Sequence, residues 1–120
     1  MCQFGESKKY RPGIEGVSKM EGLELICFKI IAAVGEARNS YLNAYRFAKR
    51  KDITAAKKCM QEAAEFFNKA HQAHAELITQ EANGDSVSVT LLLVHAEDQV
   101  MSVETLKIIA EEEILFAEGL

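Results

Sequence analysis

The absence of proline after Pro12 is the feature that most constrains the fold of this chain. Proline breaks the interior of a helix, so nothing over this stretch forces a long helix to end. Apolar residues recur there at steps of three and four in three segments, about residues 21–49, 54–82 and 88–118. Short polar turns at 49–52 and 83–86 separate the segments. Short connections make neighbouring helices antiparallel, so we predict an all-α fold, an antiparallel three-helix up-down bundle.

The length and composition predict one domain behind a short extension. Residues 1–19 combine three of the glycines and the proline without any apolar period, so we expect a flexible N-terminal extension over 1–19 and a single domain over 20–120. The net charge of −4 and the lack of a basic stripe argue against a nucleic-acid partner. There is no signal-peptide core and no apolar run of membrane-spanning length, so we expect a cytoplasmic protein without direct membrane insertion.

The three cysteines, Cys2, Cys27 and Cys59, show no metal-binding spacing. A scattered, odd set indicates reduced thiols, and the apolar helical positions of Cys27 and Cys59 predict that both belong to the core.

Two further residue positions bear on the predicted helices. Gly35 should cost its helix about 1 kcal/mol relative to alanine, which a close helix crossing could explain. Ser86 or Ser88 can cap the third helix.

The third segment carries two apolar stripes. The first is typical of a core-facing helix, whereas the second follows the alternating three- and four-residue steps of a coiled-coil seam. A three-helix monomer needs only the first, so the second predicts assembly between copies, unless a thick bundle buries both within one chain. The first stripe is Leu92, Ala96, Val103, Leu106, Ala110 and Ile114; the second, here called the seam, is Leu91, Val94, Asp98, Met101, Thr105, Ile108, Glu112 and Leu115.

Asp98 lies in the middle of the seam. If the seam lies on a rotation axis, symmetry brings one Asp98 from each subunit together, and such like charges need protons or a cation to coexist. Oxygen ligands suit a hard ion such as Mg²⁺. The alternative is a solvated aspartate with no ligand.

Three histidines are candidates for chemistry. His71 and His74 are one helical turn apart and could share a metal, but no third ligand has matching spacing. We interpret both as structural residues at the edge of the core. His95 projects between the two apolar stripes, beside Leu91, Leu92 and Gln99 in the helical projection. An isolated histidine on a helix is more often structural than functional, so the residues alone do not settle its role.

Three stretches resemble one known family. Ser88 to Met101 (SVTLLLVHAEDQVM) is similar to the phosphorylation-site helix of the lactose/cellobiose-type IIA proteins of bacterial phosphotransferase systems. Leu23 to Arg38 (LELICFKIIAAVGEAR) resembles the first helix of that family, and Lys69 to His74 (KAHQAH) resembles a run in its second. The resemblance extends over about residues 20–116.

The resemblance implies a homotrimer, a phosphohistidine at His95 and a metal on the trimer axis bound by Asp98, for which we expect one Mg²⁺ per trimer. It implies HPr as the phosphoryl donor and a cysteine of the cognate IIB component as the acceptor. The expected cargo is a β-linked disaccharide, cellobiose first and lactose second.

Around His95 we expect Gln99, Leu91 and Leu92 to contact the phosphate or a partner. Many members have a histidine where this chain has Gln99, although glutamine can still donate a hydrogen bond to phosphate. The alternatives to a phosphocarrier belong to two other classes of protein. A non-catalytic helical scaffold or regulatory bundle would carry no phosphate on His95. A di-metal helical-bundle enzyme needs Glu-x-x-His pairs, and no histidine here follows a glutamate at that spacing.

Overall fold

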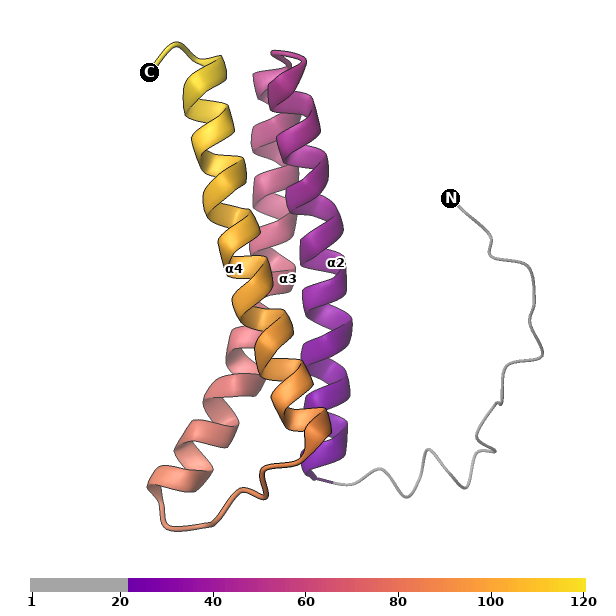
Figure 1. Ribbon diagram of the computed structural model, residues 1–120, viewed down its shortest axis with the longest axis vertical. Helices are drawn as coiled ribbons and strands as arrows, with labels where there is room; N and C mark the ends of the chain where they lie inside the picture. Colours follow the sequence, from indigo (N-terminus) through magenta and orange to yellow (C-terminus); the bar gives the residue numbers. More distant parts are fainter. Residues whose placement is uncertain (1–21) are drawn as a thin grey trace, which may run out of the picture.

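Three long helices form the whole of the regular structure in the computed structural model, which describes residues 22–120. They are α2 (Leu23–Lys49), α3 (Ile53–Ala82) and α4 (Leu91–Ala117), and they run up, down and up (Figure 1). No strand occurs in this part of the chain. The predicted all-α, antiparallel three-helix bundle is confirmed, whereas the expected extension over 1–19 lies outside the described residues. No helix over 22–120 is both long and apolar enough to cross a membrane.

The turn between α2 and α3 lies where the polar run at 49–52 predicts it. Lys51 adopts a left-handed conformation with a φ of 62°, which reverses the chain. Asp52 then caps α3, because its carboxylate accepts a hydrogen bond from the backbone N–H of Ala55 at 3.2 Å. The helix begins one residue earlier than the period of apolar residues indicates.

The start of α4 differs from the prediction. Neither Ser86 nor Ser88 caps this helix; the cap is Thr90, whose Oγ1 accepts from the backbone N–H of Leu93 at 3.1 Å. The chain must first cross from the end of α3 to the beginning of α4, which lies beside α2 (Figure 1). The residues before Thr90 cross without regular structure. At Thr90 itself the backbone is extended, with a φ of −100°.

The core is assembled mainly on α2, the helix that contacts both others extensively. Alanine supplies many of the buried positions, which lets the helix backbones approach closely, while a few large side chains fill the centre. α3 and α4 contact each other least and diverge toward the linker that joins them (Figure 1). Cys27 is fully buried, as predicted, whereas Cys59 is only partly buried. The largest fully buried side chains are Tyr41, Ile30, Val34 and Val103.

Gly35 is not explained by a close helix crossing. It is exposed on α2, and a Cβ atom built on it would meet no heavy atom within 4 Å. The expectation of a crossing at this position is therefore wrong within this chain.

Candidate functional site

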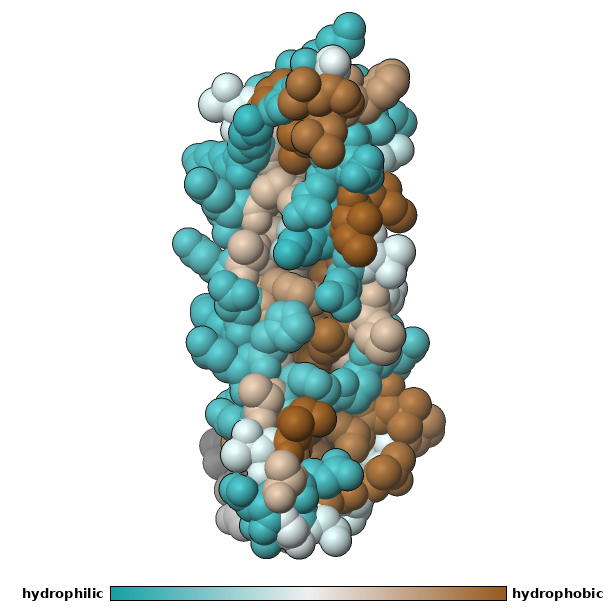
Figure 2. All heavy atoms as spheres, turned by 90° about the vertical axis from the view of Figure 1, so that its left-hand side faces the viewer, coloured by the Kyte–Doolittle hydropathy of each residue, from teal (hydrophilic) through white to brown (hydrophobic). Residues whose placement is uncertain are grey.

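The two faces of α4 differ in burial as the two stripes predict. The face that packs on the bundle contains the buried residues Ala96, Val100, Val103, Ala110 and Ile114, and Leu92 and Leu106 are partly buried beside them. All eight residues of the seam are exposed, from Leu91 at 86 % to Leu115 at 40 % among its apolar members. The three-helix bundle of residues 22–120 thus does not bury both stripes, and the alternative of a thick bundle that does so is wrong. Figure 2 shows apolar groups near both ends of this face and further apolar patches between them, interleaved with hydrophilic atoms.

Asp98 is exposed on the seam and makes no hydrogen bond or ion pair with any residue of 22–120. No group of three or more His, Cys, Asp or Glu side chains that could hold a metal occurs in this range. Carboxylate oxygens are ligands that Mg²⁺ accepts, but one monodentate carboxylate does not complete a site. Within residues 22–120, Asp98 thus has no further protein ligand beside it with which to complete a metal site.

His95 is exposed near the start of α4, in its second turn. The next residue, Ala96, is fully buried against the core, so the backbone that carries the imidazole is anchored while the ring faces outward. Leu91, one turn before, is exposed, and Leu92 and Gln99 are partly buried. His95 is therefore an accessible histidine on a packed base, and Leu91, Leu92 and Gln99 are its neighbours, as in the helical projection.

His71 and His74 occupy different environments on α3. His71 is exposed, and its ring lies edge-on against Phe67 with 4.6 Å between ring centroids. His74 is partly buried and contacts α4, where its Nδ1 lies 2.6 Å from Oε1 of Glu97. Within residues 22–120 the two histidines belong to no group of three or more possible metal ligands. Glu97 carries no signal in the sequence that singles it out; its partnership with His74 depends on how α3 and α4 rotate against each other.

Comparison with known proteins shows the family to which this three-helix chain belongs. Residues 25–118 match the family model described as the lactose/cellobiose-specific IIA subunit of the phosphotransferase system. The chain belongs to this IIA family. It is accordingly a phosphotransferase component of the phosphocarrier type, and the match includes the whole of α3 and α4.

Relatives and solved structures of IIA proteins agree with this assignment. The chain is 44 % identical over 92 residues to the lichenan-specific phosphotransferase enzyme IIA component of Bacillus subtilis (strain 168), an alignment covering 77 % of this chain and 84 % of that one. It is 33 % identical to a lactose-specific EIIA component of Staphylococcus epidermidis, over 71 % of this chain and 82 % of the relative. The crystal structure of a cellobiose-specific enzyme IIA from Bacillus anthracis superposes with a TM-score of 0.79 at 35 % identity, covering 86 % of this chain and 94 % of that one.

Proposed function

We propose that this IIA chain accepts a phosphoryl group on His95 from phosphorylated HPr and passes it to a cysteine of the cognate IIB component, in the cytoplasm. The observation that carries the proposal is the position of His95. It is the exposed histidine on α4, inside the region that matches the family, and its neighbour Ala96 is fixed in the core. Two macromolecular partners must reach the same ring in turn, and exposure permits that.

The transfer needs little covalent machinery from the protein. An imidazole nitrogen of His95 attacks the phosphorus with its lone pair, and the nitrogen–phosphorus bond of the donor histidine breaks as the new one forms. Each ring keeps the proton on its other nitrogen, so no net proton transfer is required. In the second step the IIB thiolate attacks, a sulfur–phosphorus bond forms and the bond to His95 breaks. Positioning and charge stabilisation are what the IIA chain supplies.

The location of His95 near the N-terminus of α4 supports the proposal electrostatically. Side chains on a helix lean toward its N-terminal end, so a phosphoryl group on His95 is carried toward the first turn. Backbone N–H groups without a helical partner and the positive end of the helix dipole favour negative charge there. Thr90 caps only one of these donors, the N–H of Leu93.

The neighbours of His95 suit a site that is covered only when a partner binds. Leu91 is 86 % exposed, and Leu92 is partly buried on the same turn. A docking protein can remove this apolar surface from water, which favours binding and excludes water from around the phosphoryl group. Gln99, one turn further along, has an amide that can donate a hydrogen bond to a phosphoryl oxygen.

The seam supports a homotrimer as the working form. It is an exposed row with coiled-coil spacing, and Met101 at 67 % and Ile108 at 54 % exposure lie within it. Apolar rows of this kind are typically covered by another helix. Around a threefold axis three Asp98 carboxylates would meet, and one Mg²⁺ per trimer held by their oxygens would offset their mutual repulsion.

For the sugar we propose a β-linked disaccharide, with cellobiose first and lactose second. The support is the order of similarity, because the lichenan- and cellobiose-specific proteins are 44 % and 35 % identical to this chain and the lactose-specific one is 33 %. Growth on cellobiose or lactose after deletion of this gene tests the order; a strain that loses only lactose growth would reverse it.

The test of the phosphoryl site uses phosphoenolpyruvate, the general phosphotransferase enzyme and HPr, with mass spectrometry of the IIA chain. We expect one phosphate per chain, labile in acid and stable in base as an N-linked phosphate is. His95→Gln should keep the fold and remove the phosphate, because it removes the nucleophile. His71→Gln is the matched control at another exposed histidine and should leave the phosphate in place. Phosphorylation of the His95→Gln chain at the wild-type rate would overturn the assignment.

A further inference from the structure

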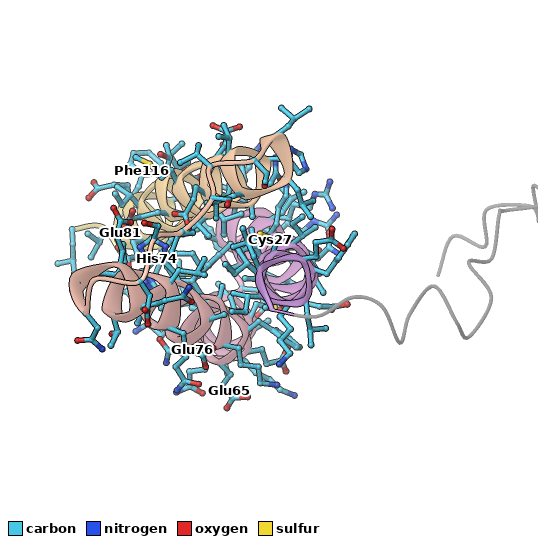
Figure 3. The ribbon with its side chains drawn as sticks, turned by 90° about the horizontal axis from the view of Figure 1, so that it is seen from below. Cys27, Glu65, His74, Glu76, Glu81 and Phe116 are labelled. Carbon is cyan, nitrogen blue, oxygen red and sulfur yellow. The ribbon has the colours of Figure 1, made fainter. Side chains whose placement is uncertain are left out.

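We infer that His74 and Glu97 are positioning residues for the transfer at His95, because the hydrogen bond between them fixes the rotation of α4 where it carries that histidine. The inference rests on the proposed function. His74 Nδ1 and Glu97 Oε1 are 2.6 Å apart, and each side chain is only 32 % exposed. An ionised carboxylate only accepts, so the Nδ1–H of His74 donates to Glu97. In Figure 3, His74 lies on the side of α3 toward α4.

The bond lies where α4 has little other support from α3. The two helices diverge toward the linker over residues 83–90 (Figure 1), and Val87 is the one residue of that linker that is even partly buried. Over residues 22–120, two side-chain ion pairs join α3 to α4 or to its C-terminal cap. One is His74–Glu97, and the other is Lys57–Glu118, also 2.6 Å long, at the opposite end of α4.

At this level α4 packs on the core through Ala96, which is fully buried, with Leu92 and Leu93 partly buried one turn before and Val100 buried one turn after. The side chain next to Glu97 in this packing is a methyl group, so the bond to His74 adds a directional restraint to apolar contacts that have none. Successive residues advance by about 100° around a helix, so Glu97 and His95 project to nearly opposite sides. A bond that holds Glu97 therefore also sets the direction of His95.

A small rotation is enough to matter for transfer. With side chains reaching about 6 Å from the helix axis, a roll of roughly 20° moves the imidazole by about 2 Å. Misplacing reacting groups by about 1 Å can slow a reaction about a hundredfold. The hydrogen bond opposes this roll, and it does so without touching the phosphoryl group.

The experiment uses substitutions that separate the bond from the bulk of the side chains. In His74→Asn the amide nitrogen occupies nearly the position of Nδ1 and can still donate, whereas His74→Leu has similar size and no donor. We expect His74→Leu and Glu97→Ala to slow the maximal rate of His95 phosphorylation about tenfold at saturating phospho-HPr. His74→Asn should stay within about twofold of the wild type, and every variant should still reach one phosphate per chain.

Glu118→Ala is the matched control, because it breaks the other bridge between the same helices far from His95. We expect it to lower the melting temperature about as much as Glu97→Ala and to leave the transfer rate unchanged. A wild-type rate in Glu97→Ala, equal slowing by Glu118→Ala, or a His74→Asn chain as slow as His74→Leu would each overturn the inference.

A second measurement is independent of phosphorylation. In ¹⁵N spectra of histidine side chains, the His74 Nδ1–H should be visible in the free protein and lost in Glu97→Ala. Its absence in the wild type would overturn the positioning inference alone. A wild-type chain that shows the bond and takes no phosphate would instead overturn the proposed function.

Discussion

The hydroxyl of Tyr41 is an unpaired polar group in the middle of the core. The ring is almost fully buried and packs edge-on against Phe67, with 6.2 Å between centroids. The hydroxyl oxygen is buried and has no hydrogen-bond partner within 22–120. Burial, reinforced by the carboxylate of Glu111, raises the pKa of Tyr41, so the hydroxyl remains protonated. It therefore carries the cost of desolvation without a bond that offsets it.

We predict that Tyr41→Phe stabilises the protein by about 1 kcal/mol, because the substitution removes the unpaired group and keeps the ring. Chemical denaturation of both proteins at equal concentration measures the difference. Tyr45→Phe, at a partly exposed ring on the same helix, is the control and should change little. A loss of stability in Tyr41→Phe would show that the hydroxyl has a partner.

At the scale of single residues, the sequence predicts which side chains are exposed better than it predicts which side chains bond to one another. The exposure of His95 agrees with its position between two stripes whose period can be counted. The bond between His74 and Glu97 is not predictable in the same way. It joins residues from two helices whose relative rotation depends on all the packing between them, and a change of one helix position would separate the pair.

At the scale of the helices, α2 contains a residue that lowers its stability. Gly35 lies in its interior, has no positive φ and is surrounded by open space where a side chain would project. Glycine costs a helix interior about 1 kcal/mol relative to alanine through lost backbone entropy. Nothing within the described chain requires a glycine here.

We predict that Gly35→Ala raises the free energy of unfolding by about 1 kcal/mol, with no change in phosphate uptake. The melting temperature and the phosphorylation assay measure the two effects. Ala32→Gly, at an exposed position one turn earlier, is the reverse control and should destabilise the protein by a similar amount. A destabilised Gly35→Ala would mean that another molecule approaches the helix at this point.

The sequence predicts the number and approximate extent of the helices correctly, with ends that differ from the observed ones by up to three residues. Long amphipathic periods and the lack of proline leave few alternatives. The ends of the helices are less certain. Two serines precede α4 as possible caps, yet Thr90 is used, because the start of the helix is set by where the chain reaches α2 and not by the first capping residue available. Local patterns thus predict the elements, and the tertiary path sets their boundaries.

At the scale of the whole molecule, the exposed seam makes assembly the central expectation. We predict a mass of three times the 13.3 kDa of one chain by light scattering at micromolar concentration. Met101→Asp should dissociate the assembly, because it places more charge in a row that would be buried between helices. Glu104→Asp, also on α4 but outside the seam, is the control and should leave the mass unchanged. A wild-type mass of one chain would contradict the trimer.

Asp98 should destabilise the same assembly. We predict that Asp98→Leu raises the melting temperature and makes it independent of chelator, because three carboxylates held near an axis cost more than an apolar layer of similar volume. Thermal melts with and without chelator measure this. Glu104→Leu should show neither effect. Equal melting of Asp98→Leu and the wild type under both conditions would mean that Asp98 does not lie on the axis.

Polar residues recur along the seam at intervals of seven, at Asp98, Thr105 and Glu112. A threefold axis along the seam would make the three α4 helices parallel and in register. In the proposed trimer each His95 would lie in the second turn of its own α4, so the three rings would occupy the same height around the axis. A partner protein that leaves one ring would then have two more within a short diffusive step. One encounter with HPr or IIB could therefore serve several subunits in succession.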